Sequence, residues 1–107
     1  MKKIIGVCAC PAGIAHTYMA AEALERAGKR RGFTVKIETN GSGGVENKLT
    51  TEDIAAADYV IIAADMKVEM ERFIGKPLLE FSVTEAVRKV ENIYKKVEED
   101  AFPIYKG

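Results

Sequence analysis

Residues 4–17 read IIGVCACPAGIAHT, which is an apolar run, then a loop of small residues, then the start of a helical pattern. The unbroken apolar run from Ile4 to Cys8 is typical of a strand that is buried on both faces of a parallel sheet. The helical pattern continues to Arg31 and stops at Gly32. Cys10 is therefore predicted at a strand-to-helix junction, where the helix dipole favours an anion such as a thiolate or a phosphate.

Composition limits the classes of protein that fit. The chain has 107 residues, enough for one domain, which we expect to span residues 1–100 with a tail or linker at 101–107. Sixteen basic and sixteen acidic residues balance, so no net field attracts nucleic acid or anionic lipid. Two cysteines separated by one residue form no ordinary disulfide framework, which favours the reducing cytoplasm. Pro11 and Gly13 interrupt the N-terminal apolar run, and no run reaches the length of a membrane span, so we expect neither a signal peptide nor direct membrane insertion.

The rest of the chain alternates predicted strands and helices. Strands are predicted at 33–38, 59–64 and 78–81, and helices at 52–57, 66–73 and 83–100, with residues 39–44 as a glycine-rich connection. Residues 33–38 alternate between apolar and polar types, so this strand is expected to have one wet face. The pattern predicts an α/β fold: a four-stranded parallel sheet of order 2-1-3-4 with helices on both faces, Rossmann-like and doubly wound.

In such a sheet the ligand crevice lies beyond the carboxyl ends of the strands, where the strand order reverses. Here that point is between the first strand and the strand at 59–64. Cys10 and Asp65 follow these two strands and are expected at the mouth of the crevice. We expect Asp65 to cap the helix predicted at 66–73 and to lie outside the site, because its ionised carboxylate would repel a phosphoryl group.

Several roles compete for Cys10. Cys8 belongs to the strand and fits a buried structural role. A metal site of Cys8, Cys10 and His16 lacks a fourth ligand, and a redox pair of thioredoxin type needs two intervening residues instead of one. A cysteine phosphatase places an arginine six residues after its cysteine, whereas this chain has His16 there. Without that clamp the loop is suited to phosphoryl transfer, with Cys10 holding the group and passing it on.

Five segments carry a family resemblance: CPAGIAHTYMAAEAL at 10–24, ETNGS at 38–42, LTTEDIAAAD at 49–58, AAD at 63–65 and ERFIGKP at 71–77. The chain resembles, over roughly residues 3–100, the fructose-specific enzyme IIB domain of the bacterial phosphoenolpyruvate-dependent sugar phosphotransferase system. The resemblance implies that Cys10 is the catalytic, phosphorylated residue. The implied phosphate-binding loop consists of Pro11, Ala12, Gly13, Ile14, Ala15, His16 and Thr17.

The resemblance also implies partners. Cys10 would receive its phosphoryl group from a phosphohistidine on enzyme IIA and pass it to a sugar held by membrane enzyme IIC, at the inner face of the membrane. No cofactor, metal or nucleic acid is expected, and the chain is expected to be a monomer. Two alternatives stay open: a regulatory or sensory protein similar to enzyme IIB, and a related sugar specificity of mannose or mannosyl-glycerate type. His16 is expected to donate a hydrogen bond, with acid–base catalysis as the alternative; Thr17 either donates its hydroxyl or completes the helix start.

Three residues depart from the usual pattern of this family, which has threonine at Ala12, glutamine at Asn40 and a small or polar residue at Cys8. A threonine hydroxyl donating to a charged phosphoryl oxygen contributes about 1.5–3 kcal/mol. We therefore expect Ala12→Thr to raise the rate of phosphoryl transfer from a cognate enzyme IIA, measured by the rate at which the chain is labelled. An unchanged or lower rate would contradict this expectation.

Overall fold

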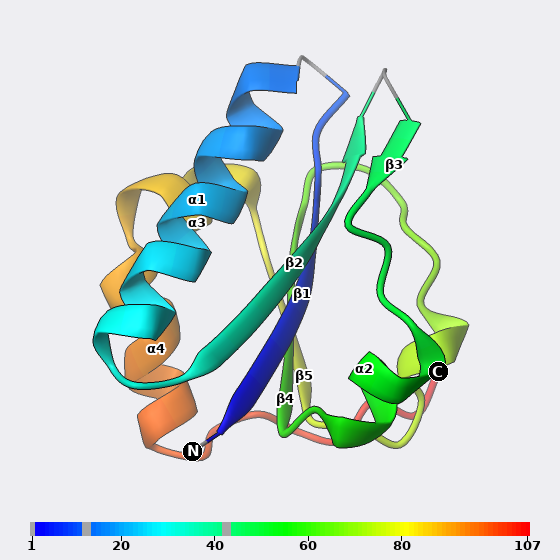
Figure 1. Ribbon diagram of the computed structural model, residues 1–107, viewed down its shortest axis with the longest axis vertical. Coiled ribbons are helices and arrows are strands. Elements are labelled where there is room, and N and C mark those ends of the chain that lie inside the picture. The colour runs from blue at the N-terminus through cyan, green and yellow to red at the C-terminus, as the bar shows by residue number, and fades with distance from the viewer. Residues whose placement is uncertain (1, 12–13, 42–43) are drawn as a thin grey trace.

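The structure, a computed structural model, describes residues 2–11, 14–41 and 44–107 (Figure 1). Ala12 and Gly13, two members of the predicted phosphate-binding loop, lie outside the described residues. The elements are, in chain order, β1 (Lys3–Ala9), α1 (Ile14–Arg30), β2 (Thr34–Gly41), β3 (Gly44–Glu46), α2 (Thr51–Ala56), β4 (Tyr59–Ala64), η1 (Glu71–Phe73), β5 (Leu78–Phe81), α3 (Val83–Arg88) and α4 (Val90–Glu98).

These strands form one sheet of order β3-β2-β1-β4-β5. The four predicted strands are parallel and lie in the predicted order, with β1 between β2 and β4. The prediction of only four strands is wrong, because β3 pairs antiparallel with the end of β2. Residues 39–41, expected to begin a plain connection, continue β2, and the chain returns at Gly44, whose φ of 105° is a conformation that glycine tolerates.

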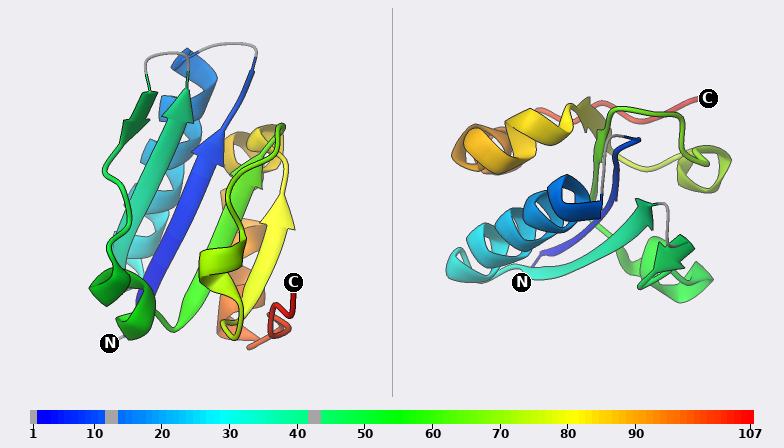
Figure 2. Two further views of the ribbon diagram at one scale, coloured as in Figure 1. Left: turned by 90° about the vertical axis from the view of Figure 1, so that its right-hand side faces the viewer. Right: turned by 90° about the horizontal axis from the view of Figure 1, so that it is seen from above.

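Two layers cover the sheet, as expected of a doubly wound fold. Helices α1, α3 and α4 lie against one face, and α2 and η1 against the other (Figure 2). Along β1 the apolar side chains alternate between these layers: Ile4 and Cys8 belong to the core beneath α1, and Ile5 and Val7 to the core on the opposite face. This alternation is what places Cys10, the next residue on the α1 side, beneath the helices.

The sequence patterns TTED at 50–53 and SVTE at 82–85 each predict a capping box, and both boxes are present. Thr50 and Asp53 exchange side-chain and backbone hydrogen bonds at the start of α2, and Ser82 and Glu85 do the same at the start of α3. Each pair satisfies amide groups that a helix start leaves without partners. These local signals therefore fixed where both helices begin.

Two helix predictions are wrong. Residues 66–70 form no helix, and only the short 3-10 turn η1 stands where a helix was expected over 66–73. The helix predicted over 83–100 is two helices, α3 and α4, separated at Lys89, whose φ of −130° is not helical. The break redirects the chain so that α4 buries Ile93, Tyr94 and Val97, and the Tyr94 hydroxyl donates to the Leu24 carbonyl of α1 at 2.6 Å.

The C-terminal segment packs against the start of β5. The Leu78 amide donates to the Pro103 carbonyl at 2.9 Å, and Tyr105 exchanges backbone hydrogen bonds with Gly75 and Lys76. Phe102 is buried in the core beneath α1. Residues 101–107 are therefore held in place instead of frayed, although their separation from a domain over 1–100 stays a prediction. Across the described ranges, no helix has both the length and the apolarity to cross a membrane.

Candidate functional site

Strand β1 delivers Cys10 to the carboxyl edge of the sheet, at the point where the strand order reverses. Ala9, the last residue of β1, pairs with Asn40 of β2 on one side and with Ala64 of β4 on the other. Its carbonyl also accepts the Asp65 amide at 2.9 Å. The backbone leading into Cys10 is thus fixed on both sides, and the reversal of strand order falls beside it, between β1 and β4.

The Cys10 side chain lies on the α1 face of the sheet. It belongs to the core that includes Ala20, Ala21 and Val83, and it is 6% exposed. Only a small part of the Cys10 side chain is therefore open to a reactant. A cavity of about 420 Å³ beyond the end of β4 lies on the other face, among Ile62, Val68 and Met70, and Cys10 does not line it.

The start of α1 supplies groups suited to an anion. Helix α1 begins at Ile14, four residues after Cys10, and has no acidic residue in its first turn. Free backbone amides and the positive end of the helix dipole meet there. Thr17 is 2% exposed, and its hydroxyl has no hydrogen-bond partner among the described residues. A buried hydroxyl without a partner is costly, so this oxygen is a group that a ligand could satisfy.

The remaining described members of the predicted loop are exposed: Pro11, Ala15 and His16. His16 lines a cavity between α1 and α3. Their part in binding a phosphate, like that of the whole stretch from Pro11 to Thr17, stays a prediction. We expected Asp65 to cap a helix at 66–73, and this expectation is wrong. Its carboxylate instead accepts a hydrogen bond from the Val83 amide at 3.2 Å, which joins the end of β4 to the start of α3.

Cys8 lies beneath α1 as well but is fully buried. Burial, with a smaller contribution from the charge of Glu25, raises the pKa of Cys8 to about 12. The thiolate is the reactive form of cysteine. The predicted structural role of Cys8 therefore fits its surroundings, and the catalytic role of Cys10 stays a prediction.

This contrast between the cysteines is testable by alkylation. We expect iodoacetamide at pH 8 to label Cys10 in the folded chain and to leave Cys8 unlabelled, because a thiol with a pKa of about 12 is about 10⁻⁴ ionised at that pH. Peptide mass spectrometry measures both sites, and labelling in urea is the control that exposes Cys8. Comparable labelling of Cys8 in the folded chain would contradict the prediction.

The structure contains a buried ion pair, between Glu38 and Arg72, that was not predicted from the sequence. Glu38 of β2 is 2% exposed. Each of its two carboxylate oxygens accepts a hydrogen bond from one terminal nitrogen of Arg72, and both N···O distances are 2.7 Å. The same carboxylate accepts the Leu49 amide at 3.0 Å and the Asn40 side-chain amide at 2.9 Å. The expectation of a wet face is wrong at Glu38, because the segments carrying Leu49 and Arg72 cover the end of β2.

This pair predicts a dependence of stability on acid. Burial raises the pKa of Glu38, but hydrogen bonds from Arg72, Leu49 and Asn40 outweigh burial and hold the pKa below its usual range. A carboxyl group whose pKa is lower in the folded chain than in the unfolded chain stabilises the fold at pH values above the unfolded-state pKa. This contribution is lost as the pH falls through the folded-state pKa. We expect the free energy of unfolding to fall between about pH 5 and pH 2.

Urea titrations at several pH values measure this fall, and it should be smaller in Glu38→Gln. Some fall should remain in that variant, because Lys36 and the Thr50 amide also hold the pKa of Asp53 well below its usual value. An identical fall in Glu38→Gln would contradict the role given to Glu38.

Comparison with known proteins agrees with this geometry. The family model described as "PTS system, Lactose/Cellobiose specific IIB subunit" matches residues 5–96. The chain belongs to the family of IIB components of the PTS, the phosphotransferase system. Within the family it is similar to fructose-type members: the "PTS system fructose-like EIIB component 2" of Escherichia coli is 52% identical over 99 residues, covering 92% of this chain and 93% of that one.

Two further proteins show the same similarity. The "PTS system fructose-specific EIIABC component" of Bacillus subtilis is 49% identical over 105 residues, which are 98% of this chain and 16% of that protein. A crystal structure of a domain from the fructose-specific IIABC component of Borrelia burgdorferi superposes with a TM-score of 0.92 at 41% identity, covering 97% of this chain and 98% of that domain. The resemblance to fructose-type enzyme IIB is thus confirmed in both sequence and fold.

Proposed function

We propose that this chain is the phosphocarrier of a fructose-type phosphotransferase system, with Cys10 as the residue that carries the phosphoryl group. Enzyme IIA is the donor and the sugar bound by membrane enzyme IIC is the acceptor, which makes the chain a part of a protein-phosphohistidine–sugar phosphotransferase. The family supports the phosphotransferase role. The name EIIABC joins the A, B and C components in one relative, and the name EIIB'BC joins B and C in another.

The transfer consists of two displacements at phosphorus. In the first, the Cys10 thiolate attacks the phosphoryl group of the donor phosphohistidine; the S–P bond forms, the P–N bond breaks, and the imidazole leaves with the bonding electrons and takes up a proton. In the second, a sugar hydroxyl attacks the same phosphorus; the O–P bond forms, the S–P bond breaks, and the hydroxyl proton passes to solvent or base. The thiolate is regenerated, and no electrons are gained or lost.

One observation carries the proposal: Cys10 directly follows the central strand β1 and lies four residues before the start of α1, where the buried Thr17 hydroxyl has no hydrogen-bond partner among the described residues. A phosphoryl group on the sulfur would meet the positive end of the helix dipole and could accept a hydrogen bond from Thr17. Phosphoryl transfer depends mainly on such positioning and charge stabilisation. A cysteine phosphatase has an arginine at the position of His16, and the absence of this arginine favours transfer of the phosphoryl group to an acceptor instead of its hydrolysis.

Incubation with phosphorylated enzyme IIA tests this function. We expect mass spectrometry of the intact chain and of its peptides to find one phosphoryl group, on Cys10, which a sugar-loaded enzyme IIC then removes. Label on His16, or no label, would overturn the proposal. Phosphate release from an aryl phosphate is the control for the phosphatase alternative, and we expect none above background.

A further inference from the structure

Helices α1 and α3 lie side by side on the face of the sheet that carries Cys10 (Figure 2), and a groove runs between them. At its end nearest to Cys10, the groove contains a cavity of about 140 Å³. A second cavity, of about 200 Å³, shares Met19 and Val87 with the first and continues along α1 to Arg26. We call these two cavities together the α1–α3 groove.

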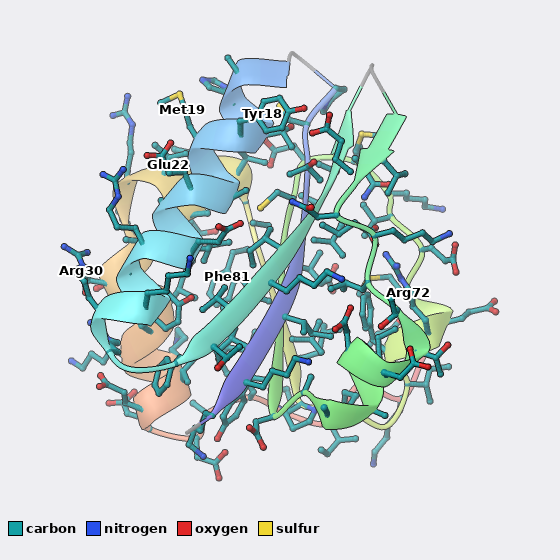
Figure 3. All side chains as sticks on the ribbon, viewed as in Figure 1. Tyr18, Met19, Glu22, Arg30, Arg72 and Phe81 are labelled. Carbon is teal, nitrogen blue, oxygen red and sulfur yellow. The ribbon has the colours of Figure 1, made fainter. Side chains whose placement is uncertain are left out.

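The floor of the α1–α3 groove is apolar. Val83 is buried, Val87 is half-buried, and Met19 is 49% exposed. Figure 3 shows Met19 leaving α1 on the side away from the strands, whereas Tyr18 points towards β2 and β3, where its hydroxyl donates to Glu46 at 2.5 Å. A cavity of about 150 Å³ has the volume for a molecule of the size of benzene. Here Met19, Val83 and Val87 supply the apolar part of the lining, and His16, Thr84 and Arg88 supply the polar part. The cavity near Cys10 therefore has room for one apolar side chain.

The rim of the α1–α3 groove is positive. Arg88 is exposed and has no carboxylate partner among the described residues, and His16 stands across the cavity from it on α1. Farther along, Arg26 is neutralised by Glu22 four residues earlier. A surface that complements this groove carries an apolar side chain with a carboxylate close to it.

We propose that the α1–α3 groove is the docking surface for the phosphoryl donor, enzyme IIA, which inserts an apolar side chain beside Met19 and Val87 and sets a carboxylate against Arg88. The inference rests on the proposed function for the identity of the donor. Cys10 lies on the same face, in the core that also contains Val83 of the groove floor, so a protein that docks in the groove lies close to the sulfur. The donor brings an anionic phosphohistidine, whereas the sugar acceptor is neutral, and the positive rim favours the anionic partner.

A pair of matched charge reversals tests the docking surface. Arg88→Glu reverses the exposed cation at the rim of the groove, and Lys67→Glu reverses an exposed cation at the same edge of the sheet but beside the cavity on the opposite face. Titration calorimetry with unphosphorylated fructose-type enzyme IIA measures binding without any transfer. We expect Arg88→Glu to weaken binding about tenfold and Lys67→Glu to change it less than about twofold.

Thermal unfolding of both variants shows that each is folded. Equal affinities of the two variants, a larger loss in Lys67→Glu, or no binding by the wild-type chain would overturn the docking surface. The groove could instead bind a second copy of this chain. Self-association that Arg88→Glu removes, while enzyme IIA still binds this variant, would show this and would also overturn the proposed docking of enzyme IIA. Phosphorylation of Cys10 is measured separately: a wild-type chain that binds through the groove but takes no label refutes the proposed function and leaves the docking surface intact.

Discussion

Replacing Arg72 by alanine is expected to lower the free energy of unfolding by about 3–5 kcal/mol, because it leaves the Glu38 carboxylate buried without its opposite charge. Glu38 is 2% exposed and Arg72 holds both of its oxygens at 2.7 Å. The backbone amide of Leu49 and the Asn40 side chain remain as donors, but neither carries a charge. Urea unfolding at neutral pH measures the loss.

Arg30→Ala is the matched control. Arg30 pairs with Glu91 at 3.1 Å on the surface, and both side chains are more than half exposed. Figure 3 shows Arg30 at the rim of the molecule and Arg72 close to η1. Exposed pairs contribute at most about 1 kcal/mol. Equal losses in Arg72→Ala and Arg30→Ala would show that burial of Glu38 does not have the energetic weight given to it.

A double variant, Glu38→Gln with Arg72→Met, separates the pair from its surroundings. It removes both charges together and keeps a side chain of similar length at each position. Because no isolated charge stays buried, we expect it to be less destabilised than Arg72→Ala. This comparison distinguishes the cost of an unpaired carboxylate from the loss of packing of Arg72 against Phe73, whose ring centre lies 4.8 Å from the guanidinium carbon.

The frame of the fold was predictable because local patterns and topology rules agree on it. Two continuous apolar runs became the central strands β1 and β4, and the handedness of parallel crossovers left few possible strand orders. The two capping boxes marked helix starts through hydrogen bonds within four residues, so they depend on little else in the chain. The place of Cys10 followed from the same rules.

The features that sequence reasoning missed depend on contacts between distant segments. Glu38 reads as a solvated residue until Leu49 and Arg72, which are 11 and 34 residues away, close over it. The charged and apolar mixture at 66–70 resembles an exposed helix, yet its apolar side chains Val68 and Met70 pack against the core as a loop. Lys89 is neither glycine nor proline, so no local signal marks the break between α3 and α4.

The α1–α3 groove was hidden for the same reason. His16 and Met19 belong to α1, and Val87 and Arg88 belong to α3, almost 70 residues later along the chain. The helical spacing of Val83 and Val87 predicts which face of α3 is buried, but it does not predict that Arg88 lines the same cavity as His16. The Thr17 hydroxyl was considered as a donor from sequence, but its burial without a partner required the packed helix.

Replacing Cys10 by serine is expected to reduce transfer of the phosphoryl group from enzyme IIA to sugar to the level of a mixture that lacks this chain. A serine hydroxyl is almost entirely protonated at neutral pH and is a much weaker nucleophile than a thiolate unless an adjacent base activates it. The backbone amides at the start of α1 and the Thr17 hydroxyl remain in the variant, so a loss of transfer isolates the role of the sulfur. Sugar phosphate formed in the reconstituted relay is the measured quantity.

Cys8→Ala is the matched control, because it removes a second sulfur from the same face of β1. We expect it to lower the free energy of unfolding by about 1–2 kcal/mol through lost burial, and to leave transfer close to that of the wild-type chain. Two cysteines two residues apart would then differ completely in function, because strand β1 buries one and ends before the other. Phosphoryl transfer that survives in Cys10→Ser, or that disappears in a folded Cys8→Ala, would contradict the assignment of the chemistry to the Cys10 sulfur.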